Sequence, residues 1–207
     1  MKFTIAENNW FIQVWFWRTS KFFCKTFARI ILLSIQFSKC KGEELVRVSN
    51  HPNWINFSRN PLNINDSPRV IIYINIRLSH LCFLLQKDIL NYRNVFCVFF
   101  FNHISVYFLI NVYSDSSQLA LKYLKDTEVN INNVLIMTGN FNIRDCSWDP
   151  NFRFHSLHKD TLINIADAFH LELSMPTNHV LTRYSDNQWD SNSVIDLIFL
   201  QTRLIGA

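Results

Sequence analysis

The chain has 207 residues, of which 49% are hydrophobic and 17% charged, so it can form one folded domain and is not a wholly disordered chain. Its net charge of +4 is uneven: residues 1–50 carry eight Lys or Arg against three Glu, and the remainder sums to −1. This distribution argues against strong non-specific binding of nucleic acid by the rest of the chain through charge alone.

Residues 1–50 differ from the rest in being basic and aromatic. Four basic residues share one face of a helical projection and five apolar residues share the other: Arg18, Lys21, Lys25 and Arg29; Phe16, Phe23, Phe27, Ile30 and Ile31. Segment 10–37 is therefore compatible with core packing, with a targeting or partner-docking helix, or with an amphipathic helix at a membrane surface. The sequence leaves these alternatives open.

The five cysteines indicate neither a disulfide framework nor a metal site. No pair has CxxC spacing and no Cys/His cluster has the spacing of a zinc site, so free thiols in a reducing compartment are expected. Neither a secretory signal nor an uninterrupted apolar run of about 18–20 residues is found. We expect an intracellular protein, nuclear or cytoplasmic, that does not span a membrane.

Residues 51–68 have the composition of a linker, because Pro52, Pro61 and Pro68 punctuate a stretch rich in Asn and Ser. We place a domain boundary near residue 66. The predicted organisation is an N-terminal segment (1–50), the linker (51–68) and a folded domain (69–207).

After the linker, the pattern predicts alternating strands and helices. The predicted strands cover residues 69–77, 95–101, 104–113, 134–137 and 194–200. The pair Asn102-His103 indicates a hairpin turn between the second and third strands. Helices are predicted from a cap at Ser116 or Ser117 to about Val129, and over 161–171. Such alternation favours an α/β domain.

Two places within this pattern suggest chemistry. Gly139, Asn140 and Asn142 follow a buried strand, and ligands gather at the carboxyl ends of strands in α/β sheets. The alternative is a turn stabilised by Asn side chains. Asp196 lies inside an apolar run, where a carboxylate must be paired, hydrogen-bonded or bound to metal unless it lies on an exposed edge strand.

These fragments carry a resemblance when they are taken in order. Asn111-Val112-Tyr113 ends a strand, a helix follows, and then come residues 134–142, Trp148, a second helix, Pro176-Thr177 and residues 193–199. This order resembles the endonuclease/exonuclease/phosphatase superfamily, specifically the endonuclease domain of non-LTR retrotransposons. The similarity covers about residues 69–200.

The resemblance implies a four-layer, deoxyribonuclease I-like α/β sandwich that is truncated at its C-terminal end, and Mg²⁺-dependent hydrolysis of phosphodiester bonds in DNA, without a small-molecule cofactor. It also implies site roles. Asn142 would hold the phosphate, Tyr113 would contact it, and Asp196 would orient a histidine that comes later in the chain. Position 140 would carry the Asp that activates water.

Three departures from the family pattern imply a weakened enzyme. Position 140 is Asn140, whose amide cannot act as a general base near neutral pH. The family's terminal Ser-Asp-His element does not occur in these 207 residues, and His155, His158, His170 and His179 are interpreted as surface or loop residues. No metal ligand is assigned, because Glu43 and Glu44 lack a family pattern around them.

We therefore expect a DNA endonuclease relative that is impaired or inactive, with weakened Mg²⁺ binding. One alternative is a catalytically silent remnant of the fold or a nucleic-acid-binding fragment. The other is a membrane-surface or interaction protein that acts through segment 10–37.

Overall fold

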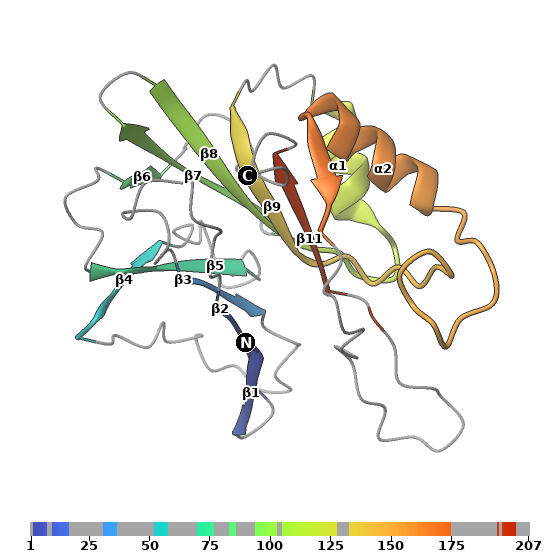
Figure 1. Cartoon of the computed structure of the whole chain (residues 1–207), viewed down its shortest axis with the longest axis horizontal. Helices are drawn as coiled ribbons and strands as arrows, with labels where there is room; N and C mark the ends of the chain where they lie inside the picture. Colours follow the sequence, from blue (N-terminus) through green and yellow to red (C-terminus); the bar gives the residue numbers. More distant parts are fainter. Residues whose placement is uncertain are drawn as a thin grey trace.

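The computed structural model (Figure 1) describes residues 2–7, 10–16, 31–36, 52–57, 70–76, 83–85, 94–102, 105–127, 133–174, 194 and 196–201. These residues form two β-sheets and two helices. Among them, no helix has both the length and the apolar character needed to span a membrane.

The first sheet has five strands in the order β1-β2-β3-β5-β4, and every neighbouring pair is antiparallel. Its strands are β1 (Lys2–Glu7), β2 (Trp10–Phe16), β3 (Ile31–Gln36), β4 (Trp54–Phe57) and β5 (Val70–Asn75). Five consecutive residues of β5 are buried, as expected for an apolar strand that lies between two others and is covered on both faces.

The second sheet has six strands in the order β10-β11-β9-β8-β7-β6. Its strands are β6 (Phe83–Leu85), β7 (Val95–Asn102), β8 (Ser105–Tyr113), β9 (Val134–Asn140), β10 (Leu171–Leu173) and β11 (Asp196–Gln201). Only β8 and β9 are parallel to each other. Helix α1 (Leu119–Asp126) lies in the crossover that this parallel pair requires, and α2 (Lys159–Ala168) lies between β9 and β10.

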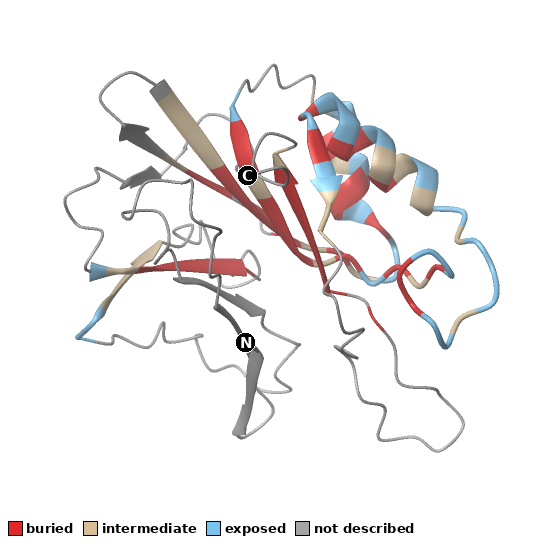
Figure 2. Ribbon diagram, in the orientation of Figure 1, coloured by how far each residue is buried: buried red, intermediate tan, exposed pale blue. Residues whose placement is uncertain are grey.

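Side chains of the second sheet alternate between two cores, as the two-residue period of a strand requires. On β8, Leu109 packs in the core shared with the first sheet, whereas Ile110 and Val112 pack in the core shared with the helices. Figure 2 shows that β5, β9 and β11 are mostly buried. The helix-side core includes Ala120, Leu121 and Leu124 of α1 and Leu162, Ile165 and Ala166 of α2. The inter-sheet core joins Val70, Ile72 and Ile74 of β5 to Val98, Leu109 and Leu135.

The two sheets also share a buried polar contact. The side chain of Asn111 on β8 donates a hydrogen bond from Nδ2 to the backbone oxygen of Ile71 on β5 at 3.1 Å, and Asn111 is fully buried. The described residues therefore form a helical layer, a six-stranded sheet and a five-stranded sheet. These are three layers of the expected four-layer sandwich, and they confirm the α/β class.

The strands expected after the linker are all present. β9 continues three residues beyond the predicted 134–137 and ends at Asn140. β7 and β8 form the expected hairpin, but Asn102 pairs with Ser105, so the connection is 103–104 and not the predicted Asn102-His103 pair. Asn102 forms the last pair between β7 and β8, although its polar side chain had predicted a place in the turn.

Both predicted helices exist with shifted ends. The cap expected at Ser116 or Ser117 is wrong, because Asp115 first closes a turn by accepting the backbone N–H of Ser117. The helix starts only after Gln118, which adopts a left-handed conformation (φ 55°). Val129, the expected end of α1, lies outside the described residues. The second helix begins and ends before the predicted 161–171, since Leu171 already belongs to β10.

The N-terminal segment contributes strands that its basic pattern did not suggest. The helix interpretation is wrong at its ends, because Phe16 belongs to β2 and Ile31 to β3; residues 17–30 lie outside the described residues. The expected linker contains β4, which pairs with β5 on one edge while β3 pairs on the other. One sheet thus continues across residue 66, and the division into domains remains a prediction.

Gly139 permits the close approach of the parallel strands β8 and β9. Its φ is 146°, and a Cβ atom at this position would lie 1.8 Å from the backbone oxygen of Val112, its partner on β8. No side chain is compatible with that distance. The pairing of β8 with β9 at this end therefore depends on glycine.

Replacing Gly139 by alanine is expected to lower the free energy of unfolding by on the order of 3 kcal/mol, since it combines backbone strain with overpacking. Urea denaturation measures the change. Asn133→Gly, at an exposed residue that also has positive φ, is the control and is expected to change stability by less than about 0.5 kcal/mol. A Gly139→Ala protein as stable as the wild type would contradict the pairing.

Candidate functional site

Three of the predicted site residues lie on β8, β9 and β11, which are neighbouring strands of the second sheet (Figure 1). Tyr113 at the end of β8 is in register with Asn140 at the end of β9, and Asn140 is in register with Asp196 at the start of β11. Residues directly opposite each other on neighbouring strands point to the same face of a sheet. The side chains of Tyr113, Asn140 and Asp196 therefore project from one face, with Asn140 in the middle.

That face is turned toward the first sheet. Tyr113 packs against the inter-sheet core, and Asn111, two residues earlier on β8, bonds to β5. Tyr113 and Asn140 are half-buried. Asp196 is buried on a strand between β9 and β10, which rules out the exposed edge strand that would have explained an isolated acid.

The corner after β9 is shaped by its two asparagines. Asn140 Oδ1 accepts the backbone N–H of Asn142 at 2.9 Å, and Asn142 is exposed with a left-handed backbone (φ 51°). This is the Asn-stabilised turn that the sequence allowed as the alternative to a ligand site. Because the Asn142 N–H donates to Oδ1 of Asn140, this oxygen is an acceptor. The Nδ2 group is therefore the part of the Asn140 side chain that can donate a hydrogen bond.

A second contact, which the sequence interpretation missed, holds this corner from the β8 side. Ser114 donates its backbone N–H to the backbone oxygen of Asn140 at 2.7 Å and its hydroxyl to Gln118 Oε1 at 2.6 Å. The Nε2 of Gln118 in turn donates to the backbone oxygens of Phe141 and Asn142, each at 3.4 Å. Gln118 is thus a positioning residue. The sequence interpretation did not single out Gln118, because its contacts with Phe141 and Asn142 join residues more than twenty positions apart.

The loop between β9 and α2 is organised around Asp145, which is fully buried. Its two carboxylate oxygens accept the backbone N–H groups of Ser147 and Ser156, each at 2.8 Å, and Lys159 Nζ lies 3.5 Å from Oδ1. Burial alone would raise the pKa of Asp145. The hydrogen bonds from Ser147 and Ser156 and the Lys159 charge outweigh burial and lower the pKa well below its usual range.

Further contacts stabilise the same loop. The indole N–H of Trp148 donates to the backbone oxygen of Ile143 at 3.2 Å, and Trp148 is fully buried. Asp149 pairs with Arg144 at 3.3 Å, and the Arg144 guanidinium lies 4.9 Å from the centre of the Phe152 ring. These contacts give the segment after the corner a defined conformation.

The described residues of the corner are a poor match for Mg²⁺. They offer one carboxylate, Asp196, and amide oxygens, of which Asn140 Oδ1 already accepts a hydrogen bond. Mg²⁺ is bound mainly through carboxylates and water in near-octahedral geometry. Asn140 supplies no charge where an Asp is expected, and Glu43 and Glu44 lie outside the described residues. These residues do not form a Mg²⁺ site by themselves.

One group of three potential metal ligands does occur within the described ranges, and it lies in the β9–α2 loop: Asp145, Cys146 and His155. His155, His158 and His170 are exposed, as expected for surface histidines, and His179 lies outside the described residues. The contact of His155 with Cys146 and Asp145 was missed. His155 follows Cys146 by nine positions and Asp145 by ten, and neither separation belongs to a recognised zinc motif.

The lowered pKa of Asp145 predicts a specific acid sensitivity. Its folded-state pKa is below the unfolded value of about 3.9, so its stabilising contribution is present above roughly pH 4 and is lost as the pH falls further. Asp145→Asn is expected to lower the free energy of unfolding by about 1–3 kcal/mol at pH 7, and by progressively less below pH 4.

Urea denaturation at pH 7, 5 and 3 measures this difference. Asp167→Asn, at an exposed aspartate of α2, is the matched control and is expected to change stability by less than about 0.5 kcal/mol. If Asp145→Asn lowered the free energy of unfolding by the same amount at all three pH values, the charge of Asp145 would not stabilise the loop.

Comparison with known proteins bears on the family and the fold. The model of the endonuclease–reverse transcriptase family matches residues 104–207, which is half of the chain and includes Tyr113, Asn140 and Asp196. No curated protein matches the sequence. Among solved structures, the endonuclease domain of TRAS1, a telomere-specific non-LTR retrotransposon, is similar with a TM-score of 0.58 and 15% identity, over 75% of this chain and 70% of that chain.

At 15% identity the structural similarity supports the fold alone, which is the deoxyribonuclease I-like α/β fold expected from the sequence. The family match covers the strands and the corner on which the sequence resemblance was based. The chain therefore belongs to the endonuclease–reverse transcriptase family.

Proposed function

We propose that this chain binds DNA through a phosphate at the corner formed by Tyr113, Asn140, Asn142 and Asp196, and that it hydrolyses phosphodiester bonds weakly or not at all. The observation that carries the proposal is the position of Asn140, in register between Tyr113 and Asp196. A nuclease-like fold suits a nucleic-acid substrate in general, and members of the family generally depend on a metal.

The amide of Asn140 changes what this position can do. A carboxylate there could accept a proton from an attacking water, whereas an amide has no proton affinity near neutral pH. Loss of general-base assistance is expected to lower the rate by about 10²–10⁴. The weaker negative charge also favours Mg²⁺ less, and Mg²⁺ is the group that would neutralise the phosphate and activate water in such a site.

The same substitution favours phosphate binding without a metal. Because Oδ1 of Asn140 accepts the N–H of Asn142, the Nδ2 group is the part of Asn140 that can donate to a phosphate oxygen. The exposed Asn142 amide can supply a further donor, and Tyr113 lies beside Asn140 on β8. A carboxylate at position 140 would add to the negative charge of Asp196 beside it and would repel a phosphate unless a cation lay between them.

The proposal predicts a protein that nicks DNA poorly. Purified full chain is expected to show little or no Mg²⁺-dependent nicking of supercoiled plasmid, because position 140 lacks a base. Agarose-gel assays with Mg²⁺ and with EDTA measure this. Robust nicking by the wild type, abolished both by EDTA and by Asn142→Ala, would overturn the proposed loss of activity.

Binding assays with a labelled DNA duplex separate binding from cleavage. Asn142→Ala and Asn140→Asp are both expected to weaken binding in EDTA, whereas Mg²⁺ should strengthen binding by Asn140→Asp more than by the wild type. Asn164→Ala, at an exposed Asn of α2, is the matched control and should bind as the wild type does. Equal binding by all four proteins would place the phosphate site elsewhere.

A further inference from the structure

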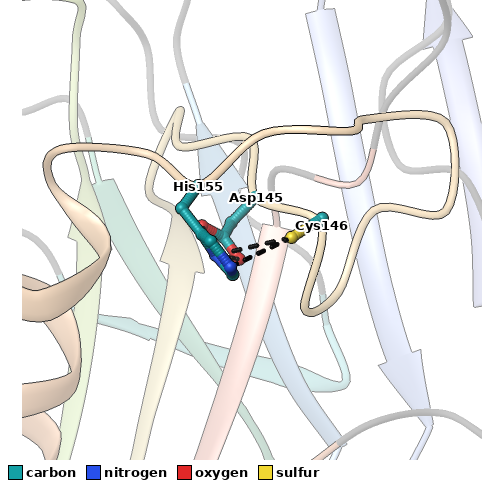
Figure 3. A group of neighbouring side chains, drawn as sticks. All are labelled: Asp145, Cys146 and His155. Carbon is teal, nitrogen blue, oxygen red and sulfur yellow. Dashed lines mark hydrogen bonds and ion pairs between the residues drawn. The ribbon is translucent and has the colours of Figure 1, made fainter.

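The β9–α2 loop brings together three side chains of different chemistry outside the corner (Figure 3). Cys146 Sγ lies 3.4 Å from Nδ1 of His155, and that nitrogen lies 3.3 Å from Oδ2 of Asp145. The ligand atoms of all three residues lie within 4.8 Å of one another. A carboxylate, a thiol and an imidazole thus face a common point.

These separations match the edges of a tetrahedron around a zinc-sized ion. Zinc binds nitrogen, oxygen and sulfur at about 2.0–2.3 Å, so neighbouring ligand atoms in a tetrahedral site are about 3.3–3.8 Å apart. The two distances from His155 Nδ1 fall within that range. The third separation, between Cys146 Sγ and the Asp145 carboxylate, is no more than 4.8 Å.

Backbone groups join the two segments of the loop that carry these ligands, residues 145–147 and 154–156. Asp145 is fixed by its hydrogen bonds from Ser147 and Ser156, one to each carboxylate oxygen. The N–H of Cys146 donates to the backbone oxygen of Phe154 at 3.1 Å, which ties Cys146 to the residue before His155. Such supporting contacts orient metal ligands before an ion binds.

We propose that Asp145, Cys146 and His155 form a binding site for a divalent transition metal of the zinc class, with its fourth position open to water or another ligand. Thiolate and imidazole ligands favour zinc and similar ions over Mg²⁺ or Ca²⁺, which require oxygen ligands. His155 and Cys146 are exposed, so an ion can enter from solvent. The site is separate from the phosphate corner and does not depend on the proposed function.

The ring contacts favour a metal site over a nucleophilic cysteine. In a catalytic arrangement one ring nitrogen contacts the nucleophile while the other contacts the carboxylate. Here Nδ1 faces Asp145 and is also the nearer nitrogen to Cys146, at 3.4 Å against 3.7 Å for Nε2. One nitrogen directed at both partners is the geometry of a shared ion.

The ammonium group of Lys159 would compete with a metal ion for the same ligand atoms. Its Nζ lies 3.5 Å from Asp145 Oδ1 and 3.4 Å from His155 Nδ1, and it donates to the hydroxyl of Ser147 at 2.7 Å. The ammonium group thus neutralises Asp145 from the side on which a metal would do so. Removing this charge is expected to strengthen metal binding, whereas a merely structural cluster would gain no metal affinity.

Titration of the reduced full chain with Co²⁺, followed by displacement with Zn²⁺, tests the site. Thiolate-to-cobalt charge transfer and the visible bands of tetrahedral Co²⁺ report the ligands directly. Cys146→Ser and His155→Gln are expected to weaken binding by at least about tenfold, and Lys159→Gln to strengthen it. Zn²⁺ should raise the melting temperature of the wild type but not that of Cys146→Ser.

His158→Gln, at an exposed neighbouring histidine, and Cys97→Ser, at a buried thiol, are the matched controls and should bind as the wild type does. Circular dichroism establishes that each variant is folded. The proposal is wrong if the wild type gives no cobalt spectrum, or if Cys146→Ser and His155→Gln leave that spectrum and the affinity unchanged.

Discussion

The parallel pairing of β8 with β9 is the constraint on which the rest of the second sheet depends. It requires a crossover, which carries α1, and a glycine at position 139, where any side chain would overlap the backbone of Val112. The same pairing places Tyr113 beside Asn140 and allows Ser114 and Gln118 to hold the corner. The position of the candidate site is therefore a consequence of backbone geometry.

Local pattern was enough to predict most elements after residue 69, because apolar runs and helical spacing depend on neighbouring residues alone. The corner was also visible, since glycine and asparagine are the residues that tolerate unusual backbone angles; Asn133 and Asn142 do adopt positive φ. The N-terminal strands were missed because basic residues between the apolar runs imitated one face of a helix. The contact of Cys146 with His155 was missed because it depends on how the β9–α2 loop folds back over the eight residues between them.

The register between strands could not be predicted from the local sequence either. That Asp196 lies opposite Asn140 follows from the pairing of β11 with β9, which joins residues more than fifty positions apart. The family resemblance suggested that the two belong to one site, and the strand pairing supplies the physical reason. Asn140 can occupy the position at which the family resemblance implies a carboxylate and keep the shape of the corner, because its amide oxygen closes the turn to Asn142.

The proposed function requires this corner to contact a DNA phosphate through its amides. The most direct measurement is a nuclear magnetic resonance titration of ¹⁵N-labelled full chain with a short DNA duplex in EDTA. We expect the side-chain amide signals of Asn140 and Asn142, and the backbone signals of Tyr113 and Gly139, to shift together with one dissociation constant. Shifts confined to other parts of the chain, with these signals unmoved at saturation, would show that DNA does not bind at this corner.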